Sequence, residues 1–167
     1  MKKIAFGIAV FAAVAAVPAS AAGASATTDG DAAAEIVAPI AILHQRATLH
    51  FGTLVVGSIG GTVVVDDQGN ASSSPDITHV PGVTPTADVF TVSGEPGRNF
   101  SFVTEAGKVS GPAGSTDMGF TTSAALGGTL DNLTGTFDIN VGGELTVNGS
   151  QTPGSYVGTY RVTAAYN

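Results

Sequence analysis

Hydrophobic and polar residues alternate along most of the chain, and the alternation is clearest at its end. Residues 153–167 place Val157, Thr159, Arg161 and Thr163 on one face of an extended segment. The other face holds, at even positions, Tyr156, Tyr160, Val162, Ala164 and Tyr166. Spacing by two is typical of a half-buried β-strand. The three tyrosines would form a sugar-stacking platform if exposed, but a sheet must bury one face, so we expect them in the core.

Further alternating runs are separated by turn residues such as Gly, Pro, Asn and Asp. They predict strands over residues 32–43, 47–56, 62–65, 77–80, 88–93, 99–105, 117–125, 136–141, 144–148 and the last segment. The turn Glu95–Arg98 predicts a hairpin of the strands on either side, and Gly142–Gly143 predicts a break between two others. Residues 71–85 and 106–116 are predicted loops. Short strands without a helical period indicate an all-β fold, an antiparallel β-sandwich with immunoglobulin-like or jelly-roll (pilin-like) topology.

The first residues have the pattern of an export signal. Lys2 and Lys3 precede an apolar run over residues 4–17, and Pro18-Ala-Ser-Ala21 fits a cleavage site. The 14-residue run is shorter than the roughly 20 residues that a membrane-spanning helix needs. We therefore predict a signal-peptide helix at 1–21, a flexible leader at 22–31 and a single β-sandwich domain at 32–167. The mature protein would have no membrane segment and would be exported by a Gram-negative bacterium to the periplasm, cell surface or medium.

Charge and cysteine content exclude several functions. Without Lys2 and Lys3 the mature chain keeps 4 basic against 13 acidic residues, a net charge of −9. Such a balance argues against nucleic acid or an anionic membrane as the partner. The chain has no cysteine, which excludes disulfides, thiolate metal sites and cysteine nucleophiles.

The predicted strand from Ala32 to Leu43 follows the flexible leader and permits two interpretations. Pro39 has no N–H group, so this strand belongs at a sheet edge or beside a bulge. The strand either completes its own sheet or fills the open edge of a neighbouring copy. In the second case the partner is another copy of the same chain.

Five short motifs together resemble one bacterial family. They are Leu49-x-Phe51-Gly52, Gly61-Thr-Val-Val64, Phe90-x-Val92-x-Gly94-x-Pro96-Gly97, Val141-Gly-Gly-x-Leu145 and Gly154-x-Tyr156-x-Gly158-x-Tyr160 with Tyr166. The set is similar to the exported domain of unknown function 4402 (DUF4402), and more distantly to spore-coat-U and chaperone–usher pilin subunits. The resemblance covers residues 32–167 and implies a surface or secreted β-sandwich without an assigned activity.

No residue pattern indicates catalysis or metal binding. The serine hydrolase motif Gly-x-Ser-x-Gly is absent from the mature chain, and His44 and His50 share one strand face without a third ligand. The acidic stretches Asp66–Asn70 and Asp29-x-Asp31 do not match a calcium-binding loop with its terminal glutamate, and turn chemistry explains both. A glycosidase pair among Glu35, Glu95, Glu105 and Glu144 has no positive support. We expect no catalytic, cofactor-binding or metal-binding residue, no cofactor and no enzyme activity.

The sequence thus favours a non-catalytic secreted or cell-surface structural protein, a filament, coat or matrix subunit that assembles by edge-strand pairing. The alternative is an extracytoplasmic module that binds a surface carbohydrate or another ligand through the loops 71–85 and 106–116.

Overall fold

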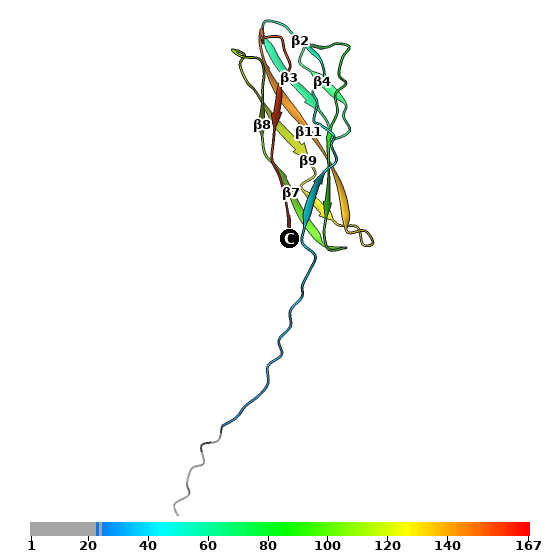
Figure 1. The fold of residues 1–167 in the computed structure, drawn as a ribbon, viewed down its shortest axis with the longest axis vertical. Coiled ribbons are helices and arrows are strands. Elements are labelled where there is room, and N and C mark those ends of the chain that lie inside the picture. The colour runs from blue at the N-terminus through cyan, green and yellow to red at the C-terminus, as the bar shows by residue number, and fades with distance from the viewer. Residues whose placement is uncertain (1–22, 24) are drawn as a thin grey trace, which may run out of the picture. The chain divides into compact units, whose positions relative to one another are not determined.

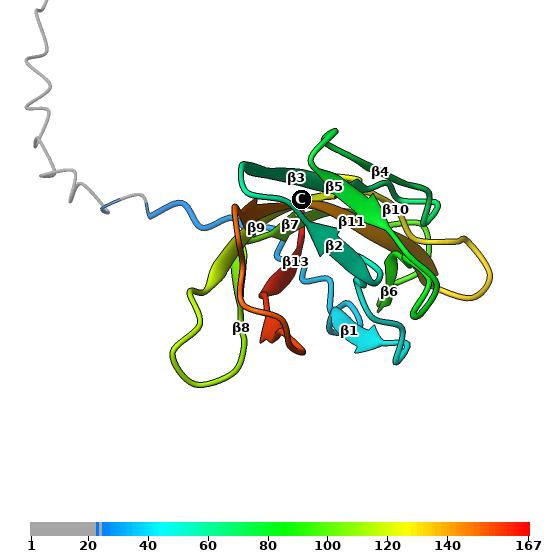
Figure 2. The same ribbon diagram turned by 90° about the horizontal axis from the view of Figure 1, so that it is seen from above.

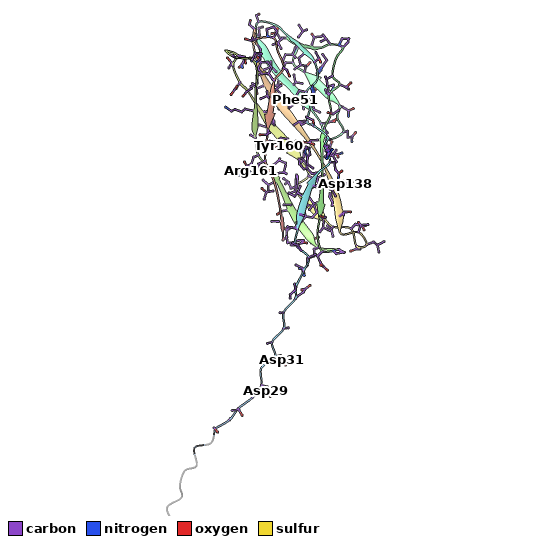
Figure 3. All side chains as sticks on the ribbon, in the orientation of Figure 1. Asp29, Asp31, Phe51, Asp138, Tyr160 and Arg161 are labelled. Carbon is purple, nitrogen blue, oxygen red and sulfur yellow. The ribbon has the colours of Figure 1, made fainter. Side chains whose placement is uncertain are left out.

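A computed structural model describes residue 23 and residues 25–167. The chain divides into two units, Met1–Glu35 and Ile36–Asn167. The described residues of the first unit, which include Asp29 and Asp31, form no helix or strand (Figure 3). The predicted signal-peptide helix lies outside the described residues. Among those residues there is no helix that could cross a membrane.

The second unit is all-β, as predicted, and no helix occurs in the described part of the chain (Figure 1). Its strands are β1 (Ala41–His44), β2 (Leu54–Val56), β3 (Gly60–Val65), β4 (Ala71–Ser73), β5 (Ile77–His79), β6 (Asp88–Ser93), β7 (Asn99–Thr104), β8 (Gly107–Ser110), β9 (Met118–Ala124), β10 (Gly127–Thr129), β11 (Thr136–Asn148), β12 (Val157–Thr159) and β13 (Val162–Tyr166).

The strands form antiparallel sheets that curve around a common interior (Figure 2). An eight-stranded sheet has the order β1-β6-β11-β9-β8-β12, with β3 paired to β11 and β4 paired to β3. A three-stranded sheet has the order β10-β7-β13, and β2 pairs with β5. The long strand β11 pairs with β9 on one edge, and with β6 and then β3 on the other. The antiparallel sandwich predicted from the alternation is confirmed.

Alternating residues of these strands fill two hydrophobic clusters. The first cluster contains Phe51, Val63, Val65, Ile77, Met118, Phe120, Leu145 and Val147. The second cluster contains Phe90, Val92, Phe100, Phe102, Leu130, Ile139 and Val141. Tyr160 packs against both clusters, with its ring centroid 6.0 Å from that of Phe120 and 6.2 Å from that of Phe90. The last segment of the chain therefore joins the two halves of the core.

The predicted C-terminal strand has the expected phase but is split between two sheets. β12 pairs with β8 in the large sheet, and β13 pairs with β7 in the small one. The tyrosines Tyr156, Tyr160 and Tyr166 are half-buried, whereas the intervening Arg161 and Thr163 are exposed. Tyr160 lies over the interior and Arg161 at the margin (Figure 3). The tyrosine face is thus part of the core, as predicted.

The predicted strand from Ala32 to Leu43 is wrong over most of its length. Only β1 forms, because Ala41 pairs with Ser93, the last residue of β6, and no further partner residue is available. Upstream, Ile36 is 95% exposed although it continues the alternation of Ile40 and Ile42. The alternation predicts which side chains share a face, but a strand forms only where a neighbouring strand is available for pairing.

Two other local predictions are also wrong. β6 and β7 do not form a hairpin, since the turn at Glu95–Arg98 carries the chain from the large sheet to the small one. Gly142 and Gly143 do not interrupt β11. A Cβ atom on Gly142 would collide with the carbonyl oxygen of Val65, so glycine permits the close approach where the β11 edge changes partner from β6 to β3.

Candidate functional site

The structure brings three polar side chains together at Asp88, the one buried charged residue of the described chain. Asp88 is 4% exposed and opens β6. Its Oδ1 accepts hydrogen bonds from the backbone N–H of Val89 at 2.8 Å and contacts His44 Nε2 at 2.7 Å. Its Oδ2 accepts a hydrogen bond from the Tyr160 hydroxyl at 2.8 Å. The Asp88 cluster, defined as Asp88, His44 and Tyr160, therefore links β1, β6 and the segment between β12 and β13.

Aromatic packing fixes the geometry of this cluster. The His44 ring stacks on Phe90 with centroids 4.8 Å apart, and Tyr160 meets Phe90 edge to face. Burial, then the hydrogen bond to Asp88 and its negative charge, raises the pKa of the Tyr160 hydroxyl well above its ordinary value. Tyr160 consequently stays protonated and acts as a hydrogen-bond donor. All three residues of the cluster form hydrogen bonds that connect separate segments of the chain, so the cluster stabilises the fold.

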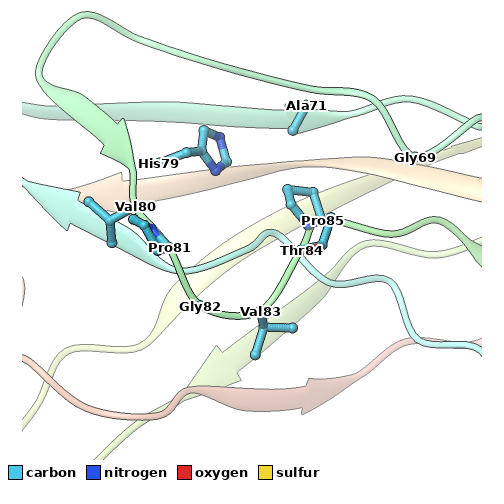
Figure 4. A pocket seen from close by; sticks show the side chains of 9 residues that line it. All are labelled: Gly69, Ala71, His79, Val80, Pro81, Gly82, Val83, Thr84 and Pro85. Carbon is cyan, nitrogen blue, oxygen red and sulfur yellow. The ribbon is translucent and has the colours of Figure 1, made fainter.

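A separate hollow of about 470 Å³ lies under the loop that follows β5 (Figure 4). Its lining consists of Gly69, Ala71, His79, Val80, Pro81, Gly82, Val83, Thr84 and Pro85. Both ring nitrogens of His79 are buried and have no hydrogen-bond partner within the described residues. This hollow belongs to the predicted ligand-binding loop 71–85.

The second predicted binding loop, residues 106–116, is in part a strand. It contains β8, which pairs with β9 and β12. A second shallow hollow, of about 420 Å³, lies instead beside β10. Its lining consists of Asn99, Phe100, Leu126, Gly127, Gly128, Thr129 and Asn167.

The histidines and carboxylates singled out from the sequence lie apart from one another. His44 contacts Asp88, while His50 Nδ1 accepts a hydrogen bond from the Gly52 N–H at 2.8 Å. Arg46, with φ of 60°, turns the chain between these histidines, so they do not share a strand face. Within the described chain, no group of three or more His, Asp or Glu side chains could hold a metal ion.

Two of the acidic candidates hold the backbone in place. The Asp66 carboxylate accepts hydrogen bonds from the N–H groups of Gln68 and Asn70 and from the Asn70 side chain. These bonds lower its pKa and close the turn, as turn chemistry predicts. Glu95 accepts a hydrogen bond from the Ala38 N–H at 3.0 Å.

Asp88 was not identified from the sequence, although a signal exists. It shares the inward phase of Phe90 and Val92, and a charged residue in the buried phase of a strand requires partners. The partners Tyr160 and His44 lie 72 and 44 residues away in the sequence, and only the fold brings them together.

Comparison with protein families gives a match over most of the second unit. A family model described as a domain of unknown function, DUF4402, matches residues 41–166, which begins where β1 begins. No curated protein and no solved structure shows detectable similarity to the chain.

Proposed function

The chain belongs to the DUF4402 family, and from that premise we propose that it is a non-catalytic, exported structural subunit that assembles by edge-strand pairing. The observation that carries this proposal is the number of unpaired strand edges. β1 and β12 end the large sheet, while β10 and β13 end the small one. A strand edge presents unpaired N–H and C=O groups, and another chain can add to it.

The polar interior also favours a structural role. The Asp88 cluster ties three separate segments, and the Tyr166 hydroxyl accepts a hydrogen bond from Glu95 N–H at 2.7 Å and donates one to the Ala38 carbonyl at 2.9 Å. These contacts stabilise a chain that has no disulfide. Resistance to unfolding is the property that a filament, coat or matrix subunit needs.

The mass of the mature chain, residues 22–167, measured by light scattering over a range of concentrations, tests the proposal. We expect assemblies larger than one chain that grow with concentration. A protein that stays monomeric at millimolar concentration would rule out self-assembly. Fractionation of cells that express the full chain tests export, since retention in the cytoplasm contradicts it.

The hollow at His79 supports a second candidate function, an extracytoplasmic module that binds a surface glycan or another small ligand. A hollow next to a buried polar group that lacks a hydrogen-bond partner supports this candidate, since ligand sites combine apolar lining with a few polar groups. A glycan array probed with the mature chain should then show saturable binding that His79→Leu abolishes. The control is His50→Leu, because His50 lies outside the lining of the hollow. No saturable binding on the array would remove this candidate.

A further inference from the structure

The turn that follows β11 contains the single Asn-Gly pair of the chain, Asn148-Gly149. Asn148 is the last residue of β11 and is exposed. The other asparagines precede Ala, Phe, Leu or Val, or end the chain. Glycine has no Cβ atom, so its backbone nitrogen is the least hindered and its φ and ψ angles are the freest. Asn148 is therefore the asparagine whose side-chain carbon Cγ the following backbone nitrogen reaches most easily.

The backbone nitrogen of Gly149 is also free of hydrogen bonds. Its N–H group forms none with the described residues, whereas the N–H of the next residue, Ser150, donates to the Gly57 carbonyl at 2.8 Å. An N–H group that is hydrogen-bonded must give up that bond before its nitrogen can react. The Gly149 nitrogen has no such bond to lose, and the neighbouring Asn148 amide is exposed to water.

These features permit deamidation without an enzyme. The Gly149 nitrogen attacks Asn148 Cγ, the new N–Cγ bond closes a succinimide ring, and the Cγ–Nδ2 bond breaks. Ammonia leaves and carries away the proton of the Gly149 N–H. Water then opens the ring. Attack of water at Cγ gives aspartate in a normal backbone, and attack at the backbone carbonyl carbon gives isoaspartate, in which the main chain runs through the side chain.

We propose that Asn148 deamidates spontaneously in the folded protein, and that the isoaspartate form loosens the contact between the end of β11 and the connection from β2 to β3. Water is the one reactant besides the chain itself. The modification does not require self-assembly or a ligand, so it stands or falls independently of the proposed function.

The close packing of the turn explains why isoaspartate disturbs it. A Cβ atom on Gly149 would collide with the carbonyl oxygen of Ser58, and Ser150 bonds to Gly57. Both contacts fix the turn against the connection between β2 and β3. Isoaspartate lengthens the backbone by one carbon atom just before Gly149, so the turn cannot keep both contacts in place.

The new carboxylate has a smaller effect on the side-chain contacts. Asn148 Nδ2 donates to Gln151 Oε1 at 3.0 Å, and deamidation replaces this donor by an acceptor. The Gln151 amide cannot turn round without loss, because its Nε2 donates to the Thr116 carbonyl at 2.6 Å and to the Tyr156 hydroxyl at 2.8 Å. One exposed hydrogen bond is lost, and the mature chain gains one negative charge beyond its net charge of −9.

Mass spectrometry of the folded mature chain, incubated at neutral and at mildly alkaline pH, tests the site. Trypsin releases residues 109–161 as one fragment, which contains Asn132, Asn140 and Asn148, so two internal controls come with each measurement. We expect the change from amide to acid at Asn148 about tenfold or more faster than at the two controls, whose next residues carry a side chain. The rate should rise with pH, because the attacking nitrogen must lose its proton.

Two variants separate the ring closure from its consequences. Asn148→Gln keeps the exposed amide but needs a larger ring, so its fragment should keep its mass. Asn148→Asp carries the new charge in a normal backbone and should unfold in urea close to the wild-type midpoint. Aged wild-type chains are separated by anion exchange, and those with isoaspartate should unfold at a lower urea concentration.

Three results would overturn the inference. Deamidation of Asn148 in the urea-unfolded chain but not in the folded chain would show that the fold protects the site. Equal rates at Asn132, Asn140 and Asn148 would show that Gly149 confers no reactivity. Isoaspartate chains that unfold at the wild-type urea concentration would show that the turn accommodates the longer backbone.

Discussion

β11 and β13 have the same alternation of inward and outward residues, but they differ in their strand pairing and in the burial of their inward side chains. β11 pairs with β6 and then β3 along one edge and with β9 over residues 141–145 on the other, and its inward residues Ile139, Val141, Leu145 and Val147 are at most 3% exposed. β13 has a neighbour on one edge, and its inward residues stay half-buried. A period of two therefore defines which face is inward, whereas the place of the strand in the fold, inside the large sheet for β11 and at the end of the small sheet for β13, decides how much that face is covered.

The largest expected effect concerns the middle of β11. Gly142→Val should destabilise the protein by on the order of 3 kcal/mol or more, because the new side chain meets the backbone of Val65 and Asp66. Gly119→Val in β9 is the control, since a Cβ atom there has nothing within 4 Å. Urea unfolding measures both. Equal stability of the two variants would show that β11 tolerates a side chain at position 142.

A matched truncation compares the two strands directly. Val141→Ala in β11 removes two buried methyl groups and should cost about 2–3 kcal/mol, including the cavity. Val162→Ala in β13 should cost about 1 kcal/mol, because Val162 is half-buried and solvent can fill part of the space. If the chemical denaturation midpoints shift by the same amount, β13 is covered as fully as β11.

Tyr160→Phe tests the connection that leads into β13. Asp88 would lose one hydrogen-bond donor while staying buried, at a cost of about 1–2 kcal/mol. The pKa of Tyr160 is raised in the folded state from its ordinary value of 10.0. Its contribution to stability is therefore complete below pH 10 and is lost as the pH rises above 10.

The pH profile separates Tyr160 from the other tyrosines. Unfolding free energy measured from pH 8 to 11 should fall above pH 10 in the wild-type protein and fall less in Tyr160→Phe. Tyr156→Phe, whose hydroxyl donates to the Thr152 carbonyl at the surface, should retain the wild-type profile. An unchanged profile in Tyr160→Phe would contradict the role of the Asp88 contact.

Several features could be predicted because they depend on local pattern. The all-β class, the inward tyrosines and the turn at Asp66–Asn70 follow from alternation and turn residues. The structure also explains glycines of the family motif, since a Cβ atom on Gly94 would occupy the space of the Tyr166 hydroxyl, and one on Gly158 would meet the backbone of β8. Gly94 and Tyr166 of the motif are thus the two sides of one contact.

Other features could not be predicted because they depend on partners distant in sequence. The turn after β6 has ordinary turn residues, and nothing local distinguishes a hairpin from a crossing between sheets. The loss of the strand upstream of Ala41 depends on where β6 ends. The Asp88 cluster required a fold that joins residues 44, 88 and 160.

Amide hydrogen exchange along β13, followed by NMR, tests the open edge most directly. In the monomer we expect slow exchange at Thr163 and Ala165, which bond to β7, and fast exchange at Val162, Ala164 and Tyr166. Uniform protection of all five amides in the monomer would contradict a β13 edge that no strand pairs with.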